Sequence, residues 1–108
     1  MALVAISQTV NPSATTDTQC YVCPANKIAT VTSFSAVNRN AASATIRYGV
    51  SNGGALVNGE YKAYDESLTA ADGKRLKPGW VLPAGYEVRV YSSNGDTDFG
   101  VTVLEESV

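Results

Sequence analysis

Two cysteines carry the most reactive chemistry in the chain, because Cys20 and Cys23 form a Cys-x-x-Cys motif. In redox proteins this motif lies at a helix N-terminus, which lowers the pKa of a thiol. Here it lies in residues 18 to 23, which read as a strand. A zinc site would need two more ligands, and the chain has no histidine and no third cysteine. We therefore expect buried or half-buried free thiols and no metal, with a strained or intermolecular disulfide as the alternative.

The absence of histidine also removes the Ser-His-Asp and Cys-His arrangements of nucleophilic catalysis. Acid–base chemistry would fall largely to carboxylates, whose close pairs are Asp65 with Glu66, Asp96 with Asp98, and Glu105 with Glu106. Neighbouring side chains on a strand point to opposite faces, so the pairs at 65/66 and 105/106 are poor catalytic dyads. We expect no enzymatic activity and no cofactor.

Residues 94 to 98, Asn-Gly-Asp-Thr-Asp, place oxygen ligands at alternate positions, as a calcium loop does. The glycine and the distal glutamate of an EF-hand loop are missing at the required spacing. An Asx-rich turn is the expected structure, with weak calcium binding as the alternative.

Aromatic side chains are the other candidates for recognition. Five of them could offer stacking surfaces for a sugar, although aromatics on alternating strands usually pack in the core or across strands: Tyr61, Tyr64, Trp80, Tyr86 and Tyr91. Trp80 is expected to anchor the core. Tyr61 and Tyr64 lie in a polar segment, residues 60 to 66, so at least one should be exposed. Exposed tyrosines are favoured at protein interfaces, which makes these two residues candidate partner contacts.

The charge balance disfavours nucleic acid and anionic membranes as partners. The formal net charge is −2, so the chain has no overall positive field. Its basic cluster of Lys74, Arg75 and Lys77 follows the turn signal Asp72-Gly73, which indicates a solvated loop. The first residues lack the basic start and long apolar run of a secretory signal, and no stretch is long enough for a membrane-spanning helix. We expect synthesis without Sec export.

A repeated sequence motif predicts two corners in the fold that positions the candidate residues. Residues 22 to 26 and 81 to 85 both fit Val-x-Pro-Ala-(Asn or Gly), and each is followed by a strand-like run. Proline presets φ for the second position of a tight turn, and Asn or Gly two residues later tolerates a left-handed backbone. Each copy is therefore predicted to be a corner between two strands.

About eight short strands follow from the alternation of apolar and polar residues and from turn signals every 8 to 12 residues. Ala44, Ile46, Tyr48 and Val50 share one face of a strand, as do Tyr86, Val88 and Val90, and Phe99, Val101 and Val103. Residues 28 to 37 are predicted to form a central strand. Strict alternation places Ala29, Val31, Ser33, Ser35 and Val37 on one face of this strand, and Ile28, Thr30, Thr32, Phe34 and Ala36 on the other.

These patterns predict an all-β, single-domain antiparallel β-sandwich. A chain of 108 residues is long enough to form one hydrophobic core. On folding, a domain of this size buries about two-thirds of the surface that its unfolded chain exposes. The two corners begin 59 residues apart, at Val22 and Val81, as the halves of a jelly roll would, each starting a strand of the opposite sheet. We divide the chain into an N-terminal strand or docking arm, 1–17, and a sandwich domain, 18–108.

The N-terminal arm is apolar on both faces. Val4, Ile6, Gln8 and Val10 alternate with Leu3, Ala5, Ser7 and Thr9. A strand of this kind is either covered on both sides or docks on a partner. Leu3, Val4 and Ile6 are the candidate docking residues.

With these motifs the chain resembles a loose group of small virion proteins of tailed bacteriophages. The resemblance covers roughly residues 14 to 103. It rests on a Ser/Thr-rich entry, on a connection with Val37, Asn38, Arg39 and Asn40, and on four segments: Tyr21-Val22-x-Pro24-Ala25, Val31-Thr32-Ser33, Ala44-Thr45-Ile46-Arg47-Tyr48 and Leu82-Pro83-Ala84-Gly85-x-x-Val88-Arg89-Val90. Members of this group typically lack the Cys20/Cys23 pair.

The resemblance implies a non-enzymatic structural protein with a jelly-roll or β-sandwich fold. It implies a capsid decoration or cement protein that is made in the host bacterial cytoplasm and binds the outside of the head lattice. The expected partners are the major capsid protein or other virion proteins, together with further copies of the chain in a dimer or trimer. The alternatives are a receptor- or glycan-binding module of a tail or fibre, and a head–tail connector that forms rings.

Overall fold

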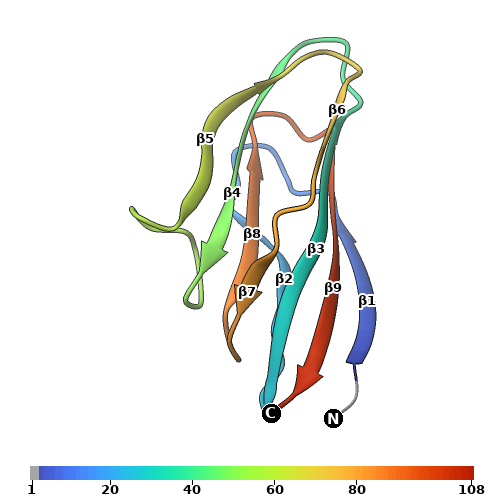
Figure 1. The fold of residues 1–108 in the computed structure, drawn as a ribbon. Helices are drawn as coiled ribbons and strands as arrows, with labels where there is room; N and C mark the ends of the chain where they lie inside the picture. Colours follow the sequence, from blue (N-terminus) through green and yellow to red (C-terminus); the bar gives the residue numbers. More distant parts are fainter. Residues whose placement is uncertain (1–2) are drawn as a thin grey trace.

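The computed structural model describes residues 3–108, which fold into two antiparallel β-sheets with no helix in that range (Figure 1). The predicted all-β, single-domain sandwich is therefore confirmed. The strands are β1 (Leu3–Val10), β2 (Thr18–Val22), β3 (Lys27–Asn38), β4 (Ala44–Ser51), β5 (Tyr61–Leu68), β6 (Gly73–Leu76), β7 (Trp80–Leu82), β8 (Glu87–Ser92) and β9 (Thr97–Ser107).

The strand order identifies a jelly roll. One sheet, sheet A, has the order β1-β9-β3-β6, with β7 also paired to β3; the other, sheet B, has the order β2-β8-β4-β5. β6 pairs with residues 34–37 of β3 and β7 with residues 29–31, so together they form one strand broken at Lys77, Pro78 and Gly79. Proline cannot donate to a sheet ladder, which accounts for the break. Counted this way, the fold has the two four-strand sheets of a jelly roll.

Both predicted corners connect the two sheets. The chain passes from β2 in sheet B to β3 in sheet A at the first corner, and from β7 in sheet A to β8 in sheet B at the second. Asn26 and Gly85 have the expected left-handed backbone, with φ of 62° and 85°. The N–H of Tyr86 donates to the Pro83 carbonyl (3.0 Å), so proline takes the first position of this turn and not the second.

The two corners also bond to each other. The N–H of Cys23 donates to the Tyr86 carbonyl (2.9 Å), and the N–H of Gly85 donates to the Cys23 carbonyl (2.9 Å). The repeated motif therefore closes one end of the sandwich from both sheets at once, by satisfying backbone groups that would otherwise be unpaired at a sheet end.

The core lies between the sheets and is built from the predicted apolar faces. Ile46, Tyr48, Val88, Val90, Phe99, Val101 and Val103 are all buried. Phe34 packs against Tyr48, Trp80 and Phe99, with ring centroids 4.6, 5.7 and 6.1 Å away. Trp80 is half-buried against this cluster, which confirms its expected role as a core anchor.

The predicted face assignment within β3 is wrong beyond Thr32. The pairing of β3 with β9 shifts between Val31 and Ser33, so one extra residue is inserted there. The bulge brings Val31 and Phe34 onto the same inner face, whereas strict alternation separated them. It also turns Ser33 and Ser35 outward. A β-bulge shifts the side-chain period by one residue, and apolar spacing alone does not reveal where it falls.

Candidate interaction surfaces

The cysteines do not form an accessible reactive site. Cys20 and Cys23 are both buried and both free, as expected. Burial raises the pKa of Cys20 from an ordinary 9.0 to about 12, and burial likewise raises that of Cys23. Because the thiolate is the nucleophilic form, these thiols are inert at neutral pH and act as small core residues.

A buried polar pair that sequence reasoning missed lies beside Cys23. The Tyr21 hydroxyl donates to Oε2 of Glu105 (2.5 Å), and both residues are buried. Burial, and next the hydrogen bond to Glu105, raise the pKa of Tyr21. Glu105 lies near the C-terminal end of β9, which continues to Ser107 and turns this carboxylate inward. The pair holds β2 to β9 across the sandwich.

The carboxylates of Asp96 and Asp98 are engaged in structural contacts. Asp96 accepts a hydrogen bond from Nδ2 of Asn40 (2.8 Å), and Asp98 pairs with Nε of Arg39 (2.8 Å). Within residues 3–108 no group of three or more His, Cys, Asp or Glu side chains is arranged to hold a metal ion. The oxygens of residues 94 to 98 thus stabilise the turn between β8 and β9.

Tyr61 and Tyr64, the two predicted contact tyrosines, lie together on the outer face of sheet B. Their rings meet edge to face with centroids 4.9 Å apart, and Tyr64 is 59% exposed. The Arg47 guanidinium lies between two rings, 4.1 Å from the centroid of Tyr64 and 4.4 Å from that of Tyr91. We call these four residues the tyrosine–arginine cluster.

Irregular pairing between β4 and β5 positions this cluster. The register of the two strands shifts twice, between Ile46 and Tyr48 and again between Tyr48 and Gly49. At the first shift Asp65 adopts a positive φ of 53°, and its Oδ1 accepts a bond from Nε of Arg47 (2.6 Å). The ion pair and the two rings fix a normally flexible arginine in one orientation.

The 52–60 loop lies over the same face beside the cluster. Three carboxylates hold it by accepting backbone N–H bonds: Asp17 from Leu56 (3.2 Å), Glu87 from Gly54 (3.0 Å), and Glu60 from Asn52 (2.9 Å) and Val57 (3.0 Å). Asp17 and Glu87 also pair with Arg89, at 2.7 and 2.8 Å. The loop is thus tied to the sheet beside the tyrosine–arginine cluster.

The outer face of sheet A carries a group of exposed apolar side chains, with Thr30 and Glu106 between them. Ala5, Leu104, Thr30 and Val81 are direct cross-strand neighbours in one row, and Leu3, Glu106 and Ile28 form the adjacent row. The exposed fractions of Leu3, Val81, Ile28 and Leu104 are 64, 60, 40 and 37%. We call Leu3, Ala5, Ile28, Val81 and Leu104 the sheet A patch. Grouped exposed apolar side chains mark interaction sites, whereas scattered ones do not.

The candidate docking residues of the arm face different directions. Leu3 pairs with Glu106 and belongs to the outer patch, whereas Val4 and Ile6 pair with Glu105 and Val103 on the inward face. Ile6 packs against the core, and Val4 remains 44% exposed. All of residues 3–10 pair with β9, so this part of the predicted arm is an edge strand of the sandwich. Met1 and Ala2 lie outside the described residues.

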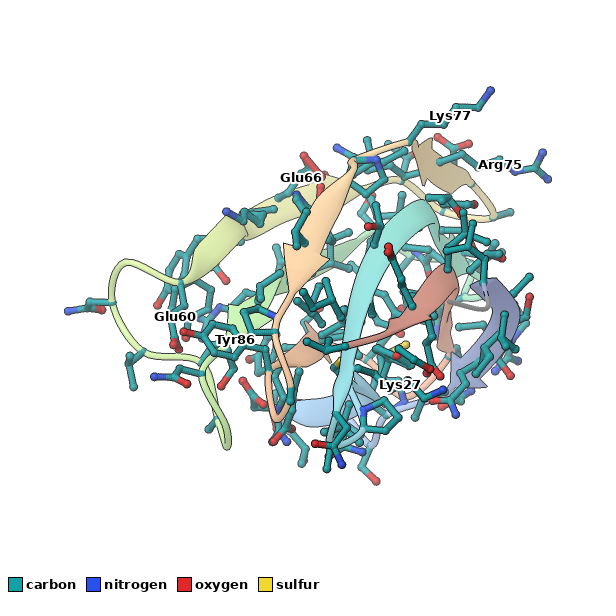
Figure 2. All side chains as sticks on the ribbon, turned by 60° about the horizontal axis from the view of Figure 1, so that its bottom comes forward. Lys27, Glu60, Glu66, Arg75, Lys77 and Tyr86 are labelled. Carbon is teal, nitrogen blue, oxygen red and sulfur yellow. The ribbon has the colours of Figure 1, made fainter. Side chains whose placement is uncertain are left out.

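Sheet A has two further surface features, a groove and a group of basic side chains. Beyond the sheet A patch, a shallow groove of about 220 Å³ is lined by small hydroxyl residues such as Ser7, Thr9, Ser33 and Thr102 around Gly100. In the predicted basic cluster, Lys74 pairs with Glu66. Arg75 and Lys77 extend away from the body of the molecule as exposed side chains (Figure 2).

Comparison with known proteins adds no relative. No family model, no curated protein and no solved structure matches this chain. The residues that the structure describes include no helix long and apolar enough to cross a membrane.

Proposed function

We propose that this chain is a structural protein of a bacteriophage virion that binds the outside of the head lattice and stabilises it as a decoration or cement protein. The phage assignment draws its support from the resemblance of residues 14 to 103. The observation that carries the binding role is the sheet A patch, because its large apolar side chains are exposed on one sheet face.

The physical basis of the proposed stabilisation is mass action on the assembled shell. A protein that binds the assembled lattice and not the free subunits lowers the free energy of the assembled state by an amount set by its concentration and affinity. Burying the sheet A patch between neighbouring capsid subunits would supply the apolar part of that binding free energy. The tyrosine–arginine cluster, which contains the predicted contacts Tyr61 and Tyr64, provides a second contact on the opposite sheet.

The test compares Val81→Lys with Val57→Lys. The two valines are equally exposed, at 60 and 61%, but Val81 is in the sheet A patch and Val57 is in the loop over sheet B. Each purified variant is sedimented through a density gradient with virions of the encoding phage that lack the protein. We expect Val81→Lys to lose at least about 90% of particle binding, because a charge buried at an interface costs more than 1.4 kcal/mol. Val57→Lys should bind like the wild type; equal binding by both variants would refute the proposed surface.

The tyrosine–arginine cluster favours a second candidate, a glycan-binding module of a tail or fibre. An exposed tyrosine ring beside a fixed arginine offers a stacking surface and hydrogen-bond donors on one sheet face. A glycan array separates the two functions, because a fibre module should bind specific glycans through Tyr64 and a decoration protein should bind none. Tyr64→Ala serves as the matched variant.

A further inference from the structure

The four open edges of the two sheets are not equally protected. Natural sheets block edge-to-edge pairing with short strands, bulges, prolines and charges on the edge. β6 and β7 at one edge of sheet A are short, carry Lys74 and Arg75, and are interrupted at Pro78. In sheet B, β2 is short and bulged between Gln19 and Tyr21. Each of these edges therefore resists a further strand.

The other edge of sheet B, β5, is protected differently. It carries Lys62, Asp65 and Glu66, and its register with β4 shifts twice. Its backbone is further distorted at Asp65, where φ is positive. Irregular, charged backbone of this kind presents no even row of N–H and C=O groups to a partner.

β1 lacks all of these protections. Its eight residues, Leu3–Val10, contain no charge, no proline and no glycine. They pair one-to-one with β9 from Leu3↔Glu106 to Val10↔Phe99 without a bulge. The strand is also incompletely covered on its inward face, where Val4 is 44% exposed. A regularly paired, uncharged edge with partly exposed apolar side chains is a template for another strand.

We propose that β1 pairs antiparallel with β1 of a second copy, so that the two copies of sheet A join into one continuous sheet. The strand is self-complementary. An antiparallel pair about a two-fold axis places residue i opposite residue j with i + j constant, and matching the inward and outward faces requires an even sum. Pairings centred on Ala5, Ile6 or Ser7 satisfy this condition, and none of them brings charges together, because residues 3–10 carry none.

A second copy fits this edge better than an open chain of copies. Two-fold pairing consumes the β1 edge of both partners, and the three remaining edges of each copy are protected. Growth therefore stops at the dimer, since an isologous interface is closed. This inference refines the expected oligomer to a dimer and does not depend on the proposed capsid role, because the chain alone suffices to test it.

The test is the oligomeric state of Ala5→Lys with Ser7→Lys, measured by sedimentation equilibrium on the full chain at micromolar concentrations. Both residues are exposed on the outer face, so the double variant should fold. It places lysines opposite each other in each of the three registers centred on Ala5, Ile6 and Ser7. Because facing like charges destabilise strand pairs, we expect the dissociation constant of the dimer to rise about tenfold or more.

The matched control is Ile28→Lys with Val81→Lys, which adds the same two charges to the same sheet face but away from the β1 edge. This control should remain dimeric, and far-UV circular dichroism should show all variants folded. A monomeric or trimeric wild type would overturn the proposal. So would a dimer that survives the β1 lysines, or one that the control dissociates, because pairing would then use another surface.

Discussion

At the scale of single residues, Asn38 links three loops by hydrogen bonds at the end of the sandwich opposite the two corners. Its Nδ2 donates to the carbonyls of Ala42 (2.9 Å), Leu68 (3.1 Å) and Thr69 (3.2 Å). Its Oδ1 accepts from the N–H of Asn40 (3.0 Å) and from Nδ2 of Asn94 (3.2 Å). The side chain is fully buried, so these bonds replace water for three different loops.

We predict that Asn38→Ala lowers the free energy of unfolding by about 3 kcal/mol, because it leaves several buried polar groups unpaired. Asn52→Ala, which removes an exposed amide, should change it by less than about 0.5 kcal/mol. Urea unfolding measures both variants. Similar losses in the two would mean that the hydrogen bonds of Asn38 do not stabilise the fold.

The Cys20 thiol makes the free energy of unfolding depend on pH in the alkaline range. Its pKa is 9.0 when exposed and about 12 in the fold, so above pH 9.0 the unfolded chain loses a proton that the folded chain keeps. Deprotonation then favours unfolding, and this thiol lowers the free energy of unfolding by about 1.4 kcal/mol per pH unit until pH reaches the folded pKa. Below pH 9.0 its contribution is constant.

We therefore predict that Cys20→Ala flattens the fall in unfolding free energy between pH 9 and 11. Burial of Tyr21 and Cys23 will keep part of the slope, since their pKa values are also raised. Urea unfolding at several pH values measures the slope. An unchanged slope in the variant would show that the Cys20 thiol titrates alike in both states.

At the scale of elements, the 52–60 loop approaches strand β4 closely at Gly49. A Cβ added there would lie 2.3 Å from the Glu60 carbonyl oxygen and 3.0 Å from the Leu56 side chain. Only glycine lets the 52–60 loop approach β4 this closely. The loop in turn bounds the tyrosine–arginine cluster.

Gly49→Ala should displace this loop and lower the free energy of unfolding by at least about 2 kcal/mol, because backbone cannot move aside as a side chain can. Limited proteolysis should cut within residues 52–60. Gly95→Ala is the control, since an added Cβ there meets nothing closer than 3.9 Å. Equal stability and equal protease resistance in the two variants would contradict the close approach.

Apolar alternation predicted most strands but not their irregularities. β4, β8 and β9 bury the residues that their sequences place on one face. In β3 the same rule misplaced Phe34, because the bulge at Val31/Ser33 depends on the pairing with β9 and not on β3 alone. Bulges arise between strands, so a single strand's sequence does not encode them visibly.

The candidate interaction surfaces were only partly predicted, because they too depend on how the strands pair. Tyr61 and Tyr64 stood out because both are aromatic within one polar segment. Arg47 and Tyr91 join them from β4 and β8, which are adjacent only in the folded sheet. Strand pairing likewise places Val81, Ile28 and Leu104 on the same sheet face as Leu3, which the order of residues along the chain does not reveal.

At the scale of the whole molecule, the fold is a slab with two broad faces and two edges. Its extents are 46 × 25 × 19 Å, and the short dimension matches two sheets packed about 10 Å apart plus their outer side chains. The repeated corner predicted the change of sheets at both places, whereas the split of one edge strand into β6 and β7 was not expected. The sheet A patch and the tyrosine–arginine cluster lie on opposite faces of the sandwich. Pairing at β1 uses the backbone groups of the strand edge, so dimer formation leaves both faces available.

Under the proposed function, this chain decorates the exterior of a phage head. Electron microscopy of virions that carry a gold-labelled copy of the protein tests this location. We expect label distributed over the head surface at regular lattice positions. Label confined to the tail or fibres, or particles that carry none, would contradict it.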